Sequence, residues 1–205
     1  MPSRERLHRR AIRLEWFTVA WNIVEALIAL GAGIVAGSVA LVSFGADSLI
    51  EVISASALLW RLRRAGPDAS EDEHGRAEQR ALLLVSATFF LLAAYIAYEA
   101  ITALLRGTEP DSSIVGLVLS VLSLMIMPVL ARLKQHTGRS MGSEALQADA
   151  VETWICAYLS LALLTGVGLH MAFGLWWADP VAAAAMLPVV LWQGWETGQE
   201  ARELS

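Results

Sequence analysis

Long apolar stretches separated by short polar connections dominate the sequence. A bilayer core about 30 Å thick needs about 20 predominantly apolar residues in each spanning helix. Six stretches have that length and composition. We predict a membrane-spanning helix over each of 14–35, 38–60, 81–105, 112–131, 145–168 and 172–194. The pattern therefore predicts an all-α, polytopic membrane protein with six transmembrane helices.

The connections between the predicted spans differ in length. Only Ala36 and Gly37 separate the first two spans, which is typical of a tight helical hairpin. The one long polar connection, 61–80, contains a Gly66-Pro67 break and charges of both signs, so we expect a solvated loop. The expected organisation is a basic N-terminus over 1–13, a transmembrane domain over 14–194 and a short tail over 195–205.

Composition agrees with a membrane protein. Hydrophobic residues make up 56% of the chain and charged residues 17%, against about 25% charged residues in ordinary soluble domains. This composition excludes a disordered tail, a nucleic-acid binder with a basic face and a disulfide scaffold, and Cys156 is the only cysteine. The basic N-terminus is not followed by a short apolar core with a cleavage site, so we expect the first span to be retained.

Basic residues are distributed unequally between the two sides of the predicted spans. Fourteen Lys and Arg residues fall on the side of the termini, and only Arg106 falls on the other side. The positive-inside rule then places both termini in the cytoplasm. We expect an integral protein of a bacterial-type cytoplasmic membrane, with the lipid bilayer as its first partner.

Carboxylates within the apolar stretches are the main candidates for chemistry. Seven lie inside or at the edge of a predicted span: Glu25, Asp47, Glu51, Glu99, Asp149, Glu152 and Asp179. A charge at the bilayer centre costs at least about 2.5–3.5 kcal/mol, and no Lys or Arg is predicted deep in a span to pair with them. Asp179-Pro180 has a structural explanation as the cap and first residue of the sixth helix. Glu99 is explained by contact with a neighbouring helix.

Two groups of residues share a helical face. Asp47 and Glu51 are four residues apart, and Asp149, Glu152 and Cys156 follow the i, i+3, i+7 spacing. Neighbouring carboxylates repel each other unless a proton or a metal lies between them. The spacing therefore favours a cation site over proton-only or structural roles, and Cys156 is either a ligand or a small buried apolar residue.

Three stretches resemble the cation diffusion facilitator family of divalent metal/proton antiporters. They are GIVAGSVALVSFGADSLIEV (33–52), GSEALQADAVETWICA (142–157) and LWWADPVAAAAM (175–186), and the resemblance covers about 12–198. It implies a bundle of the family's type with metal ligands at Asp47, Glu51, Glu152 and Cys156. Glu152 and Cys156 stand where the family usually has His and Asp, so Asp149 and Glu25 are auxiliary candidates.

The resemblance implies a secondary transporter rather than an enzyme, without a prosthetic group. We expect efflux of a divalent transition metal by proton-coupled alternating access, because metal binding needs deprotonated ligands. A thiolate ligand at Cys156 favours zinc, cadmium or cobalt, whereas Asp149 in its place favours manganese or iron(II). Zinc is the first expectation. The alternatives are a proton-coupled exporter of organic cations and a non-transporting membrane partner or metal sensor.

Family members commonly carry a cytoplasmic ferredoxin-like domain after the sixth span. About ten residues follow that span in this sequence, so we expect this domain to be missing. The family also implies a homodimer, which would then form through the membrane helices. The small residues Ala182 to Ala185 would permit close approach of two helices.

Overall fold

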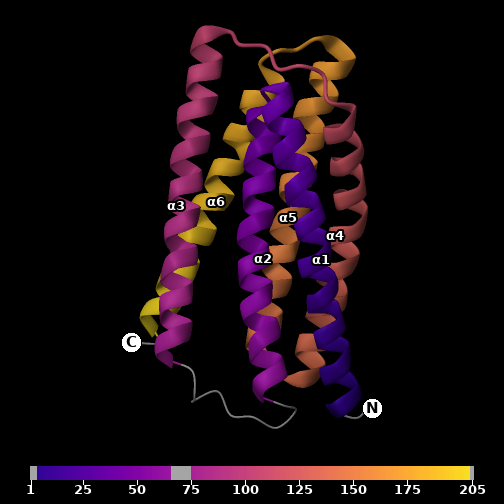
Figure 1. The fold of residues 1–205 in the computed structure, drawn as a ribbon, viewed down its shortest axis with the longest axis vertical. Coiled ribbons are helices and arrows are strands. Elements are labelled where there is room, and N and C mark those ends of the chain that lie inside the picture. The colour runs from indigo at the N-terminus through magenta and orange to yellow at the C-terminus, as the bar shows by residue number, and fades with distance from the viewer. Residues whose placement is uncertain (1–3, 66–74, 204–205) are drawn as a thin grey trace.

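The computed structural model describes residues 4–65 and 75–203, and these residues form helices and no strand (Figure 1). The six helices are α1 (Arg4–Ala36), α2 (Val39–Ala65), α3 (Gly75–Arg106), α4 (Ile114–Met141), α5 (Glu144–Phe173) and α6 (Ala178–Glu203). The predicted all-α fold with six helices is therefore confirmed.

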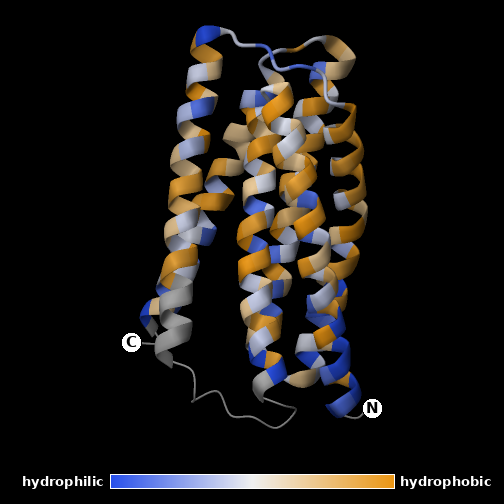
Figure 2. Ribbon diagram, in the orientation of Figure 1, coloured by the Kyte–Doolittle hydropathy of each residue, from blue (hydrophilic) through white to orange (hydrophobic). Residues whose placement is uncertain are grey.

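Five of the six helices, α1 to α5, are long and apolar enough to cross a membrane. The sixth, α6, does not meet the same criterion within the described residues. Figure 2 shows hydrophobic residues along most of the length of the helices, with hydrophilic residues toward their ends and at single positions within them. Several helices exceed the predicted spans, since α1 begins at Arg4 and α4 continues to Met141.

The first two helices form the predicted tight hairpin. Gly37, with a φ of 65°, follows the last residue of α1, and the Ser38 hydroxyl accepts a hydrogen bond from the Leu41 N–H at 3.1 Å. Both arms approach closely along their length. A Cβ added to Gly45 would lie 2.9 Å from the backbone nitrogen of Leu30 on α1. Glycine is therefore required at this crossing.

The helices form a group of four and a pair. Helices α1, α2, α4 and α5 pack together, and α3 and α6 run beside each other at one flank (Figure 1). The pair is held by a close contact: a Cβ on Gly194 would lie 3.0 Å from Cβ of Phe89, and Ser86 donates to the Gly194 carbonyl at 2.7 Å. Both described ends of the chain lie at the same end of the bundle.

Asp179 caps a different helix from the one predicted. It is the second residue of α6, yet its carboxylate accepts hydrogen bonds from the Ser38 hydroxyl and from the N–H groups of Val39 (2.8 Å) and Ala40 (3.3 Å). The first N–H groups of a helix lack intrahelical partners, so a buried carboxylate satisfies them well. The predicted structural role of Asp179 therefore holds, but the predicted helix is wrong: Asp179 caps α2, not α6, and connects the start of α6 to the start of α2.

The small residues of α6 contribute to packing within the chain. Ala182 and Ala183 are buried, and a Cβ on Gly166 of α5 would lie 2.5 Å from Cβ of Ala182. These positions therefore serve the contact between α5 and α6. A homodimer through membrane helices stays a prediction, and these two alanines are not exposed for it.

Candidate metal centre

The predicted pair on α2 points toward the interior. Asp47 and Glu51 are both buried, one helical turn apart, because the α2 face that carries them is covered by neighbouring helices. Oε1 of Glu51 accepts a hydrogen bond from the Thr153 hydroxyl of α5 at 3.3 Å. Its Oε2 is buried and has no hydrogen-bond partner. One carboxylate oxygen of this pair is thus left available to a ligand.

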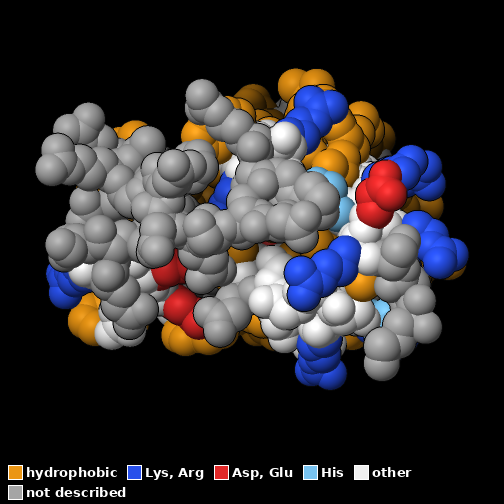
Figure 3. Space-filling view, turned by 90° about the horizontal axis from the view of Figure 1, so that it is seen from below, with side chains coloured by type: hydrophobic (Ala, Val, Ile, Leu, Met, Phe, Trp, Pro, Cys, Tyr) orange, Lys and Arg blue, Asp and Glu red, His pale blue; other side chains and the backbone are white. Residues whose placement is uncertain are grey.

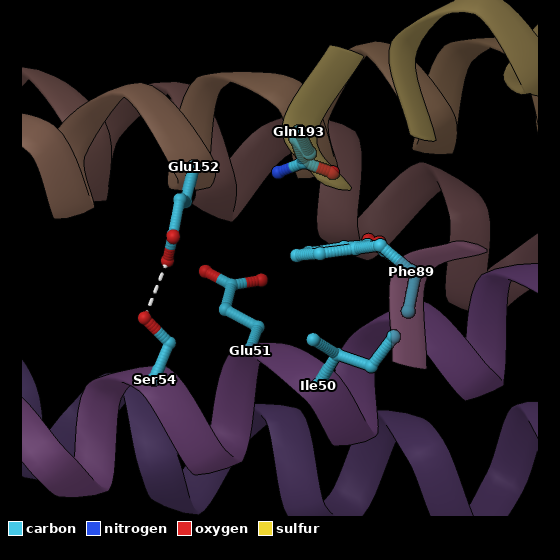
Figure 4. A pocket seen from close by; sticks show the side chains of 7 residues that line it. Ile50, Glu51, Ser54, Phe89, Glu152 and Gln193 are labelled. Carbon is cyan, nitrogen blue, oxygen red and sulfur yellow. Dashed lines mark hydrogen bonds between the residues drawn. The ribbon is translucent and has the colours of Figure 1, made fainter. Parts of the chain in front are cut away.

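Glu152 of α5 lies opposite Glu51. Figure 4 shows the two carboxylates directed toward each other, with Glu152 also accepting from the Ser54 hydroxyl at 2.8 Å. Together they border a small cavity, lined by Asp47, Ile50, Glu51, Ser54, Phe89, Glu152 and Gln193. The volume open to the centre of a water-sized sphere is about 10 Å³, which is room for about one water or one monatomic ion.

A larger cavity adjoins the small one. It has about 340 Å³ by the same measure and lies between α5 and α6, lined by Ala148, Val151, Glu152, Ile155, Gln193, Glu196, Thr197, Gln199 and Glu200. Glu152 and Gln193 belong to both cavities. The larger cavity is bordered by the first residues of α5 and the last turns of α6, so it lies toward the end of the bundle that carries both termini.

The predicted ligand Cys156 does not line the small cavity. Its thiol contacts Oε2 of Glu25 at 3.8 Å, and Asp47 and Glu51 are further charged neighbours. Glu25 is fully buried and also accepts hydrogen bonds from three other side chains: Ser48 (2.9 Å), Trp21 (3.2 Å) and Ser123. The donors come from α1, α2, α4 and α5. Glu25 therefore connects the four-helix group and is already well provided with donors.

A basic residue lies deep among the helices, contrary to the prediction. Lys134 is 0% exposed because α4 continues past the predicted end of the fourth span. Its ammonium group donates to Oδ2 of Asp149 and, at 3.2 Å, to the Thr153 hydroxyl. Oε2 of Glu15 lies 3.5 Å from the same nitrogen. The statement that no Lys or Arg pairs with the buried acids is thus wrong for Asp149.

The ion pair with Lys134 also affects Asp149 as an auxiliary candidate for a metal ligand. Asp149 is engaged with Lys134 and is absent from the lining of both cavities. Glu15 of α1 is a further buried carboxylate that the sequence did not single out. The buried acids therefore form a connected network, in which Thr153 accepts a hydrogen bond from Lys134 and donates one to Glu51 of the small cavity.

Within the described ranges, no three His, Cys, Asp or Glu residues gather closely enough to hold a metal ion. Like charges at Asp47, Glu51 and Glu152 repel one another, and each of two carboxylates has turned to a hydroxyl donor. Three members of the predicted set line one cavity, and the fourth, Cys156, lies outside that lining beside Glu25 and Glu51. A bound cation would have to draw the three carboxylates together.

Sequence reasoning missed Gln193 of α6, which lines both cavities. It also placed Lys134 in a polar connection. The available signal for Lys134 was helical register, since Lys134 and Thr137 continue the buried face of Ser123, Met127 and Leu130. The same signal marks Gln193, a polar residue inside the predicted sixth span that continues the buried face of Met186 and Val190.

Comparison with known proteins identifies the fold. The family model described as "Cation efflux transmembrane domain" matches residues 16–204. Among curated relatives, an uncharacterized transporter of Synechocystis sp. is 29% identical over 168 residues, which cover 80% of this chain and 54% of the relative.

Two relatives carry names that state a function. A cation-efflux pump of Shewanella oneidensis is 24% identical, with coverage of 88% of this chain and 62% of the relative. A manganese efflux system protein of Bacillus subtilis is 23% identical, with coverage of 89% and 64%. The chain thus spans between half and two thirds of the length of these relatives. By its match over residues 16–204, the chain belongs to the cation efflux family of membrane transporters.

Proposed function

We propose that this protein exports a divalent transition-metal cation from the cytoplasm by alternating access, in exchange for protons. The observation that carries the proposal is the small cavity, in which Asp47, Glu51 and Glu152 converge and no Lys, Arg or His is among the lining residues. Buried carboxylates need a cation or protons to offset their charge. Membership of the cation efflux family makes a metal cation the natural occupant.

The position of the larger cavity supports export. Figure 3 looks at the end of the molecule that carries both described chain ends, where several basic side chains gather over one half of the view. Arg9 of α1, Arg63 of α2 and Arg139 of α4 are exposed at this end of their helices. The positive-inside rule assigns this end to the cytoplasm. The larger cavity extends from this end of the bundle to Glu152, which supports a carrier open to the cytoplasm.

The contacts favour an all-oxygen site over a thiolate site. Cys156 is absent from the lining of the small cavity, although its thiol lies near Glu25 and Glu51, and the cavity offers oxygen atoms from carboxylates, one hydroxyl and one amide. Oxygen donors suit manganese and iron(II), whereas zinc prefers sites with nitrogen or sulfur. We therefore propose manganese as the substrate in preference to zinc, and the name of the Bacillus subtilis relative agrees with this choice.

Proton exchange follows from the composition of the same site. A divalent cation binds to deprotonated carboxylates, and protonation of these groups releases it. Because Asp47, Glu51 and Glu152 face one small cavity, metal and protons compete for the same oxygen atoms. Protons arriving from the far side would then discharge the metal.

The test is metal flux in liposomes containing the purified protein. We expect Mn²⁺ uptake, followed by a fluorescent indicator in the lumen, to be faster with an acidic lumen than without a pH gradient. Asp47→Asn should abolish this uptake. Glu99→Gln on α3, whose carboxylate is half-buried and lines neither cavity, is the matched control and should transport normally.

Uptake of Mn²⁺ and Zn²⁺ no faster than in protein-free liposomes would overturn the proposal. Metal binding without flux would instead support a sensor or partner role. Transport of ethidium in place of metal would support an exporter of organic cations, although a cavity with room for about one water does not fit such a substrate.

A further inference from the structure

We infer that Gln193 of α6 is the fourth metal ligand, its amide oxygen completing an all-oxygen site with Asp47, Glu51 and Glu152. The inference rests on the proposed metal export and adds to it a ligand from a third helix. It explains how a site that lacks a carboxylate at position 156 on α5 can still offer four donors.

Gln193 has the burial and position of a ligand. It is 6% exposed, and it lines the small cavity together with the three carboxylates. Figure 4 shows its amide above the Phe89 ring, with the nitrogen on the side of Glu152 and Glu51 and the oxygen on the far side. A half-turn of the amide about its last side-chain bond would bring the oxygen to the carboxylates. Its Oε1 is buried and has no hydrogen-bond partner. A buried acceptor without a partner is unfavourable, so a bound cation would satisfy it.

The local packing fixes where this amide lies. Gly194, the next residue, contacts α3 so closely that an added Cβ would be 3.0 Å from Cβ of Phe89. The Gly194 carbonyl accepts a hydrogen bond from Ser86 of α3 at 2.7 Å. These contacts hold the backbone of α6 at the level of the cavity. Gln193 is thereby placed at the junction of the small and the large cavity, on the route a metal ion would take.

The chemistry of an amide suits this position. Three carboxylates already exceed the charge of one divalent cation, so a fourth carboxylate would add repulsion. An amide oxygen supplies a donor without adding charge, and carbonyl oxygens suit manganese. Cys156 is not among the residues that line the small cavity, whereas Gln193 is.

The same amide could act instead as an N–H donor that orients the carboxylates. Two substitutions separate these roles, because a glutamate at 193 keeps an oxygen ligand but cannot donate, whereas a leucine supplies neither. Gln199→Leu is the matched control, since Gln199 is exposed on the same helix and lines only the larger cavity.

Mn²⁺ binding to the purified full chain in detergent, measured by titration calorimetry, gives the answer. We expect Gln193→Leu to weaken binding at least about tenfold, as loss of groups around a metal typically does. Gln193→Glu keeps an oxygen ligand but adds repulsion, so it should bind Mn²⁺ more tightly than Gln193→Leu and less tightly than the wild type. Gln199→Leu should bind as the wild type does. Thermal unfolding of each variant without metal establishes that it is folded.

Two results would overturn the inference. One is Gln193→Leu binding Mn²⁺ within about twofold of the wild type, a difference of about 0.4 kcal/mol. The other is Gln193→Glu binding as weakly as Gln193→Leu, which would assign the amide a donor role. If the wild type itself binds neither Mn²⁺ nor Zn²⁺, the proposed function fails. If Asp47→Asn abolishes binding while Gln193→Leu does not, only the role of Gln193 fails.

Discussion

Replacing Lys134 by methionine would leave buried carboxylates without their cation. The Lys134 ammonium is fully buried and donates to Asp149 of α5 and to Thr153, with Glu15 of α1 at 3.5 Å. Methionine keeps much of the side-chain volume and removes the charge. Breaking a buried ion pair by removing one partner costs about 3–5 kcal/mol, because the other charge stays buried. For a domain of this size that corresponds to a fall in Tm of about 6–20 °C.

The assay is thermal unfolding of the detergent-purified protein, followed by circular dichroism, with the variant Lys134→Met beside Arg139→Met. Arg139 is exposed near the end of the same helix, so its substitution removes the same charge without exposing a buried partner. We expect the control to stay within about 2 °C of the wild type, since surface substitutions usually change stability by about 0.5 kcal/mol or less. A Lys134→Met protein as stable as the control would refute the reasoning.

The two acids beside Lys134 sharpen the test. Asp149 is hydrogen-bonded to the ammonium, whereas neither oxygen of Glu15 accepts a hydrogen bond. Two carboxylates share one cation, so Glu15→Gln removes an excess charge and should leave Tm unchanged or higher. Asp149→Asn should lower it. In the Lys134→Met background, adding Glu15→Gln and Asp149→Asn should recover at least about half of the loss, because no buried charge then remains unpaired. A triple variant as unstable as Lys134→Met would count against the ion-pair explanation.

Three further predictions use the same unfolding assay or the flux assay. Asp179→Ala removes the cap of α2 and should lower the free energy of unfolding by about 1–3 kcal/mol. An unchanged Tm would contradict the capping role. Gly45→Ala should lower Tm, because its Cβ would meet the α1 backbone. Gly31→Ala has open space around its Cβ and should stabilise the protein by about 0.5–1 kcal/mol. A higher Tm for Gly45→Ala than for Gly31→Ala would contradict the close contact between α1 and α2. Cys156→Ser should keep Mn²⁺ flux near the wild-type rate, because serine can still donate to Glu25; loss of Mn²⁺ flux would place the thiol in the metal site.

Much of the fold could be predicted because hydropathy and helix formation agree over most of the chain. The hairpin at Gly37 follows from the two-residue separation of the spans, and the structure has it. The ends of the helices could be predicted less well from the sequence. An apolar window stops at the first run of charges, whereas α4 continues to Met141, where Gly142 adopts a left-handed conformation with a φ of 70°. Lys134 falls between these two limits, which is why its burial was missed.

The candidate site could be predicted from the sequence only in part, because helical spacing relates residues of one helix and not residues of different helices. Helical spacing brings Asp47 and Glu51 to one face, and the structure adds that Glu152 of α5 meets them across a cavity. Spacing within one helix says nothing about which helix supplies a further side chain. Helical spacing could mark Gln193 as a polar residue on the buried face of α6, but its place beside the three acids was known only once the helices were packed.

The buried acids of this bundle differ in what their neighbours provide, and this difference separates structural acids from the candidate ligands. Glu25 receives hydroxyl, indole and thiol donors, and Asp149 receives an ammonium group. Glu51 and Glu152 of the small cavity each accept from one hydroxyl, with Lys134 nearby but not bonded to them, and among the described residues no donor lies within hydrogen-bond distance of Oε2 of Glu51. A carboxylate whose neighbours already offset its charge contributes to holding helices together. A carboxylate left short of donors beside an ion-sized space is one whose charge a transported cation can offset, and that criterion selects the cavity between α2, α5 and α6.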